Sequence, residues 1–223
     1  MYMRTWVRLP SQWIDQFRLR EITWGNGGSS NTAALMILTA IAQHADEANG
    51  ISRLTYDHLE TAANLSRAKV SEGLKVLENR ELISRLTARR SMYQLCNYGP
   101  PEEGGWAKFP ANRMYNRAGE IVPFQTFRLR SRAELDALKL FFLFVGRRGS
   151  DTNAANISYD KIEQYTGIER SRIRTGISLL IENLMIQVEQ QPSSSNEHGV
   201  SHAYRIAGIE PLQHQGTTGR RGL

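Results

Sequence analysis

The chain has 223 residues, of which 40% are hydrophobic, so it is long enough for two domains with buried cores and is not wholly disordered. Lys and Arg number 28 against 22 Asp and Glu, and the net charge of +6 suits a polyanionic partner. The single cysteine, Cys96, excludes an internal disulfide framework and a cysteine-rich zinc site. No apolar run approaches the roughly 20 residues of a membrane span and the N-terminus lacks a signal-peptide core, so we expect a cytoplasmic protein without a membrane partner.

The first predicted element is a short strand over residues 6–10, whose pattern recurs over residues 106–110. Both read Trp, small apolar, basic, large apolar and Pro, and the Pro stops each strand. Residues 17–20 and 127–130 then both read Phe-Arg-Leu-Arg. Their distances from the preceding Trp differ, so a chance match of these four letters stays open.

A helix is predicted after each strand. Asn31 or Thr32 can cap the first, which carries apolar residues at helical spacing up to residue 42. Ser131, with Glu134 three residues on, has the spacing of a capping box for the second. Residues 46–50 and 146–155 are predicted as loops that end these helices.

The clearest repeat follows, because residues 54–83 align with residues 157–186 without a gap. Seven of the 30 aligned pairs are identical, and apolar residues fall at matching places. Any two amphipathic helix pairs share some of this likeness. The ungapped length, together with the repeated strand upstream, favours an internal duplication.

Each copy has the signals of two helices joined by a tight turn. In the first copy Thr55 can cap the first helix, Asn64 can end it in the left-handed conformation, and Ser66 can cap the second helix. Gly167 makes the turn in the second copy. The predicted buried stripes of the second helices are Val70, Leu74 and Leu77 in one copy and Ile173, Ile177, Leu180, Ile181 and Leu184 in the other.

A β-hairpin is predicted to close each copy. Residues 82–86 and 91–95 flank the first tip, and residues 185–189 and 202–206 flank a longer, mobile tip. Pro and Gly mark residues 99–105 as a linker, and residues 210–223 are expected to be a flexible tail. The predicted fold class is therefore α+β, mainly α with small β-hairpins, with domains over residues 1–98 and 106–209.

The polar side of each second helix carries the candidate DNA contacts. Three basic residues on a helix commonly form nothing more than a solvated face. Here the face belongs to the second helix of a helix-turn-helix, precedes a hairpin and occurs twice, which favours DNA binding. Arg and Lys can contact phosphates or guanine, and Ser hydroxyls can contact a phosphate or a base. Of the arginines on the second copy, we expect one or two to reach base edges and the rest to hold phosphates. The candidates on these helices are Arg67, Lys69, Ser71 and Lys75 in the first copy, and Arg170, Ser171, Arg172, Arg174 and Ser178 in the second. On the first hairpin, Arg85, Arg89 and Arg90 are expected to lie over the adjacent DNA backbone or minor groove.

Residues 6–14, 31–45 and 54–83 resemble winged helix-turn-helix proteins, in particular the N-terminal origin-binding domain of phage O-type replication proteins. The last run also resembles MarR-type regulators, and the two-unit layout is similar to plasmid replication initiators with tandem winged helices. The resemblance covers most of residues 1–209 and implies a DNA-binding fold, without a signature specific to replication. Plasmid initiators often use one winged unit for dimerisation, whereas both second helices here are basic.

We therefore expect a double-stranded DNA-binding protein whose two recognition helices occupy adjacent major grooves about 34–36 Å apart, on direct repeats if the units are related by translation. The expected role is replication initiation or its control on a mobile element, and transcriptional repression is the alternative. A different class, an interaction subunit of a nucleoprotein assembly, has one winged unit binding protein. The chain itself or other replication proteins are further expected partners.

We expect neither an enzyme nor a cofactor. No phosphate-binding loop of the Walker type occurs, and the five histidines show no metal-ligand spacing with Cys96. From the sequence, Lys69→Ala and Arg172→Ala are each expected to weaken DNA binding and to leave thermal melting nearly unchanged.

Overall fold

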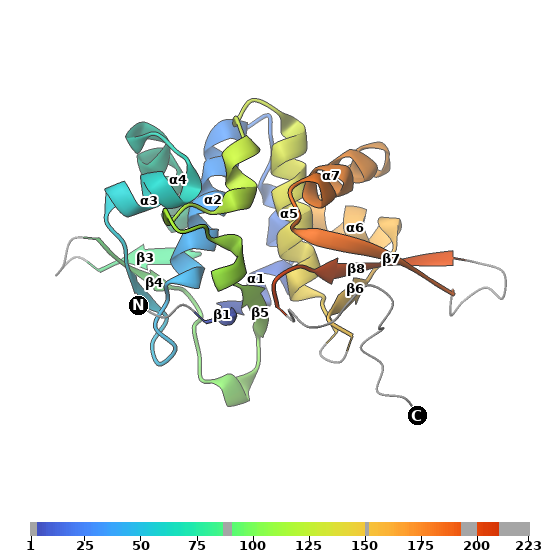
Figure 1. Cartoon of the computed structure of the whole chain (residues 1–223), viewed down its shortest axis with the longest axis horizontal. Helices are drawn as coiled ribbons and strands as arrows, with labels where there is room; N and C mark the ends of the chain where they lie inside the picture. The colour runs from blue at the N-terminus through green and yellow to red at the C-terminus, as the bar shows by residue number, and fades with distance from the viewer. Residues whose placement is uncertain (1–3, 87–90, 150–151, 193–199, 210–223) are drawn as a thin grey trace.

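The computed structural model describes residues 4–86, 91–149, 152–192 and 200–209. Within them a long helix, a short strand, two helices and a β-hairpin follow one another twice (Figure 1). The predicted α+β class and the repeated helix–helix–hairpin arrangement are thereby confirmed. The first unit contains α2 (Gly28–Gln43), β2 (Ile51–Arg53), α3 (Tyr56–Ala63), α4 (Arg67–Asn79), β3 (Ile83–Arg85) and β4 (Met92–Leu95); the second contains α5 (Arg132–Gly146), β6 (Ala154–Asn156), α6 (Tyr159–Thr166), α7 (Arg170–Glu182), β7 (Ile186–Pro192) and β8 (Val200–Ile206).

Residues 103 positions apart play the same part in the two units. The turn before α4 has Asn64 at a φ of 51°, and the turn before α7 has Gly167 at a φ of 67°. Gly73 lets α4 approach α2, because an added Cβ would lie 3.0 Å from the Ala34 nitrogen. Gly176 lets α7 approach α5, where the added Cβ would lie 3.3 Å from the Ala137 nitrogen. The two helix pairs are therefore packed in the same way.

A two-fold relation joins the units, through β1 (Trp6–Pro10) and β5 (Trp106–Pro110). These strands pair antiparallel, with Trp6 opposite Pro110 and Pro10 opposite Trp106. The Trp6 and Trp106 rings stack at 6.2 Å with planes 5° apart. Figure 1 shows α2 and α5 above this pair, with α3 and α4 on one side and α6 and α7 on the other.

Each of these strands is followed by a segment that crosses onto the opposite unit. After β1, Asp15 pairs with Arg147 at 2.9 Å. After β5, the Ile121 amide donates to the Ala62 carbonyl at 2.9 Å. The two units consequently share one hydrophobic core, while residues 99–105 between them are exposed. The crossing segments contain α1 (Gln12–Asp15) and η1 (Arg18–Glu21) after β1, and η3 (Asn112–Met114) and η4 (Val122–Thr126) after β5; η2 (Pro101–Glu103) lies before β5.

Three predicted helix starts are confirmed and one is wrong. The Thr55 and Ser66 hydroxyls accept from the amides of His58 and Lys69, and Ser131 with Glu134 forms the expected capping box. The first long helix, however, begins at Gly28, so neither Asn31 nor Thr32 caps it. Both are buried inside α2, where the Asn31 amide donates to two carbonyls of the preceding loop.

Two further corrections concern the second unit. The predicted loop over residues 146–155 contains the start of β6, which pairs with β8. Ile181 and Leu184 were predicted to be buried, but they are 42% and 80% exposed. Leu184 is exposed because α7 ends at Glu182 and Leu184 takes a φ of 56°, which turns the chain away from the stripe of Ile173, Ile177 and Leu180. Ile181 is still inside α7 and lies at the solvent-facing edge of that stripe.

The hairpins agree with the prediction in place and differ in length. β3 and β4 pair within the predicted ranges, whereas β7 and β8 extend to Pro192 and Val200, into the predicted tip. The two tips, residues 87–90 and 193–199, and the predicted tail over residues 210–223 lie outside the described residues. Among the described helices, none has the length and apolar character needed to cross a bilayer.

A lysine on α5 lies in the shared core. Lys139 is 3% exposed, and its Nζ donates to the Ile22 carbonyl at 2.7 Å. Met36 occupies the equivalent position of α2. Burial lowers the pKa of Lys139 from 10.5 to about 8, because the charged ammonium loses its hydration.

We predict that Lys139→Met stabilises the protein at neutral pH. Below pH 8 the folded protein carries the buried charge, whose cost corresponds to about 3 kcal/mol, and the lost hydrogen bond offsets about 1 kcal/mol of the gain. We therefore expect the free energy of unfolding at pH 7 to rise by about 2 kcal/mol. In the wild type it should also rise between pH 8 and 10.5, because the folded state releases this proton first; in Lys139→Met that rise should disappear.

Chemical denaturation followed across this pH range measures both effects. Lys161→Met, which removes an exposed lysine of the same unit, is the control and should change neither. A Lys139→Met protein that is less stable than the wild type at pH 7 contradicts the prediction.

Candidate nucleic-acid interface

The outer face of α7 combines hydroxyl groups with one unpaired arginine. Ser171, Arg174, Thr175 and Ser178 are all exposed and lie at helical spacing on one side. The Arg174 side chain forms no hydrogen bond or ion pair with any residue in the part of the chain that the structure describes. The opposite side of the helix, with Ile173, Ile177 and Leu180, is buried. This face is therefore free to contact a ligand.

The first arginine of each second helix is held in the same exposed cluster. The Arg67 guanidinium donates to Asp57 at 2.9 Å and to Glu60 at 3.3 Å, and it lies over the Tyr56 ring. Its hydrogen bond with Asp57 raises the pKa of Arg67. In the second unit, Arg170 pairs with Asp160 and lies over the Tyr159 ring. Because these ion pairs are open to water, a phosphate group competes with the carboxylates at little cost.

Two other predicted contacts, Lys69 and Arg172, are turned back onto the protein. Arg172 is 28% exposed at its side chain and lies 3.3 Å from the Asp136 carboxylate, whose side chain is 6% exposed. Lys69 donates to Ser29 at 3.0 Å and to Glu72. Each side chain therefore ties its helix to a neighbouring segment, and only a minor part of it faces solvent.

A basic hollow of about 590 Å³ opens beside the start of α6. Arg147, Arg148, Ser158, Lys161 and Tyr165 line it. Arg170 bridges the first turns of α6 and α7 through Asp160, so the hollow continues the polar surface at the start of α7. These basic residues are not among the contacts predicted from the sequence. The alignment of the two copies could have indicated one of them, because Lys161 is basic where the first unit has His58.

The same surface in the first unit is less basic. At the positions of Arg174 and Thr175, α4 has Ser71 and Glu72, both partly buried, and the exposed cations beside them are Lys75 and the ion-paired Arg67. Hydrogen bonds from Lys69 and Ser30 lower the pKa of Glu72, so it stays ionised. His44 takes the place of Arg147, and burial lowers its pKa. The two units therefore offer unequal surfaces.

The predicted contacts on the first hairpin are only partly described. Arg85 is exposed and pairs with Glu78 at the end of α4 at 3.0 Å. Arg89 and Arg90 lie outside the described residues.

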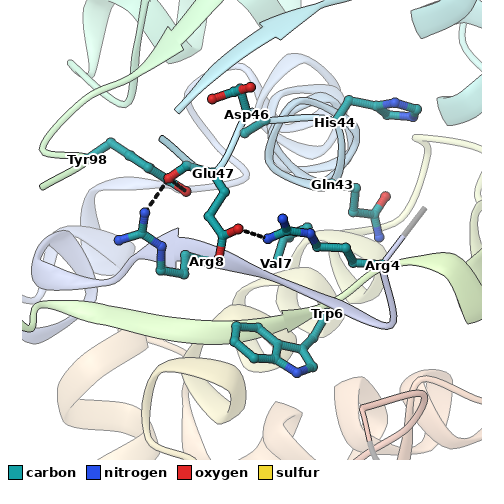
Figure 2. A pocket seen from close by; sticks show the side chains of 10 residues that line it. Arg4, Trp6, Val7, Arg8, Gln43, His44, Asp46, Glu47 and Tyr98 are labelled. Atoms are coloured by element: carbon teal, nitrogen blue, oxygen red, sulfur yellow. Dashed lines mark hydrogen bonds and ion pairs between the residues drawn. The ribbon is translucent and has the colours of Figure 1, made fainter. Parts of the chain in front are cut away.

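A separate hollow of about 300 Å³ lies beside β1 and the end of α2 (Figure 2). Its two arginines are already held by the protein: Arg8 donates to the Glu47 and Gly99 carbonyls and lies over the Tyr98 ring, with only its buried Nε left without a described partner, and Arg4 pairs with Glu47. It therefore adds no free cation to the interface. Among the described residues, no group of three or more His, Cys, Asp or Glu side chains is arranged to hold a metal ion.

We predict that Arg172→Ala destabilises the protein, whereas Arg174→Ala does not. Burial raises the pKa of Asp136 and Arg172 opposes that rise, so removing Arg172 leaves a buried carboxylate without its counter-charge. Removing one partner of a buried pair costs about 3–5 kcal/mol; because Arg172 is partly exposed and the charges of Lys139 and Arg132 still act on Asp136, we expect about 2 kcal/mol. The raised pKa means that the loss should be largest at neutral pH and should shrink at acid pH, where Asp136 is protonated.

Thermal melting at pH 7 and at acid pH measures this difference. Adding Asp136→Ala to Arg172→Ala should restore most of the stability, since Ala33 occupies that position in the first unit. Equal melting of the Arg172→Ala and Arg174→Ala proteins at pH 7 would falsify this structural role.

On α7 and around the first turns of α4 and α6, the two units offer exposed hydroxyls, an unpaired arginine, two arginines in exchangeable ion pairs and a basic hollow. Such groups are suited to contacts with phosphates and base edges. Comparisons with protein-family models, with curated proteins and with solved structures found no match to this chain.

Proposed function

We propose that the protein is a pair of winged helix-turn-helix units, derived from an internal duplication, that binds double-stranded DNA. The observation that carries the proposal is the outer face of α7, where Arg174 is unpaired among the described residues and stands among exposed hydroxyls. A recognition helix enters the major groove with its first turns, and these are the residues exposed there. The basic hollow with Lys161 lies where the preceding helix would meet the DNA backbone.

The two-fold pairing of β1 with β5 bears on the arrangement of the DNA site. Units related by a two-fold axis meet half-sites of opposite orientation, whereas translation would give direct repeats. We therefore propose inverted half-sites in adjacent major grooves, about one helical turn apart. Since α7 offers more free donors than α4, the second unit supplies the larger part of the sequence discrimination.

For the biological role, we propose initiation or control of replication on a mobile element, as the resemblance to replication proteins implies. Transcriptional repression is the competing role. Genome-wide footprinting separates them: protected sites at a replication origin support the first, and protected sites confined to promoters support the second.

We predict that Arg174→Ala weakens binding to the preferred DNA about 5- to 100-fold and leaves melting unchanged, because a base-reading arginine contributes about 1–3 kcal/mol of discrimination. Gel-shift or anisotropy titration with a site selected from random DNA measures the change. Arg4→Ala is the matched control, because it removes the same charge from the side that carries β1. The proposal for α7 is wrong if the two variants lose affinity equally.

A second prediction concerns orientation and salt. A duplex with the selected half-sites inverted should bind more tightly than one with the same half-sites in direct orientation. Affinity for both should fall steeply with salt, since each neutralised phosphate releases counterions. A flat salt response removes the electrostatic basis of the proposal.

If Lys75→Ala in the first unit leaves DNA affinity unchanged while Arg174→Ala lowers it, the first unit binds a protein instead, as in an interaction subunit.

A further inference from the structure

An apolar groove of about 410 Å³ lies at the far end of α7 from the proposed DNA contacts. Pro110, Met114, Phe141 and Met185 are buried residues of its lining. Leu184 and Val122 stand at its rim with exposures of 80% and 50%. Exposed apolar side chains around a hollow of this size are typical of an interaction site.

The two-fold relation allows a comparison with the same place in the first unit, where only about 10 Å³ is open. Pro10, Leu38 and Leu82 there correspond to Pro110, Phe141 and Met185. The backbone also agrees, since the Ala207 amide donates to Met185 as the Cys96 amide donates to Leu82. The two spaces therefore share one frame at the strand after the second helix, and they differ in the side chains that line them and in the short helix after the first strand, which is α1 in one unit and η3 in the other.

Two substitutions between the units account for the open groove. Trp13, 5% exposed, lines the closed space in the first unit, and its Nε1 donates to the Pro10 carbonyl at 2.9 Å. Its counterpart is Arg113, which is exposed and leaves the space unfilled. At the rim, Leu184 replaces Glu81. The second unit thus lacks the aromatic side chain that fills this space in the first unit, and it has an apolar residue at the rim.

The positive charge of Arg113 at the groove indicates that a ligand with an aromatic side chain also carries an acidic group. The Arg113 side chain forms no hydrogen bond or ion pair with any other described residue. Arg113 lines an apolar groove, and the equivalent space in the first unit is filled by the indole ring of Trp13. A carboxylate next to an inserted aromatic ring would pair with Arg113.

We propose that this groove binds a short segment of a protein partner that inserts one large aromatic side chain and carries acidic residues beside it. The site goes beyond DNA binding and is separate from it, because the groove lies at the C-terminal end of α7 and the DNA contacts lie at the N-terminal end. Partner and DNA are therefore bound at the same time.

The test uses the full-length protein and a synthetic eight-residue peptide with one tryptophan between two pairs of aspartates. Amide NMR titration should give saturable shifts at Met114, Leu184, Ala207 and Gly208. Leu184→Glu, which restores the residue of the first unit, should weaken binding at least about tenfold, and Arg113→Trp should do the same by filling the groove. Ile181→Glu, an exposed apolar residue of α7 outside the groove, is the control and should bind normally.

Several outcomes would overturn the proposal. Shifts that do not saturate, or that persist in Leu184→Glu, exclude the groove as the site. Equal binding of a peptide with alanine for tryptophan excludes the aromatic anchor, and equal binding with lysines for aspartates excludes the acidic flank. If sedimentation shows a dimer that Leu184→Glu dissociates, the groove is occupied by a second copy of the chain.

Discussion

The antiparallel pairing of β1 with β5 is the constraint on which the rest of the structure depends. Its register places the two copies of one strand pattern opposite each other, so the units they begin are related by a two-fold axis. The segments that follow then cross over, and each packs against the opposite unit. Neither unit buries its core alone. The positions of α4 and α7 on one body are therefore fixed by a contact far from either helix.

On a common arrangement of helices and strands the two units differ in chemistry. Glycines at the helix crossings, left-handed residues at the turns and an arginine bound to an aspartate at the start of each second helix are shared. The exposed basic residues are not: the second unit has Arg174 and Lys161 where the first has Ser71 and His58. The shared residues are those that packing requires, whereas the differences lie at solvent-facing positions, where substitutions change stability little.

The sequence could predict what depends on neighbouring residues. The caps at Thr55, Ser66 and Ser131 and the turns at Asn64 and Gly167 are local signals, and all five are confirmed. Features that depend on residues distant in the sequence could not be predicted from it. Arg172 looked like an exposed arginine because its partner Asp136 lies on another helix, and Leu184 continued a helical pattern past the point where the helix ends. The two-fold relation was not predictable either, since a repeated strand pattern is equally compatible with translation.

The three arginines of α7 show how burial decides which charges a ligand can use. Arg170 sits in an ion pair whose side chains are 63% and 81% exposed, so water screens it and exchange of the carboxylate for a phosphate changes the free energy little. Arg172 faces a buried carboxylate, and withdrawing it would leave that charge unpaired in the core. Arg174 breaks no described contact when it binds. The three arginines carry equal charge, but contact with an anionic ligand costs the least free energy at Arg174, more at Arg170 and the most at Arg172.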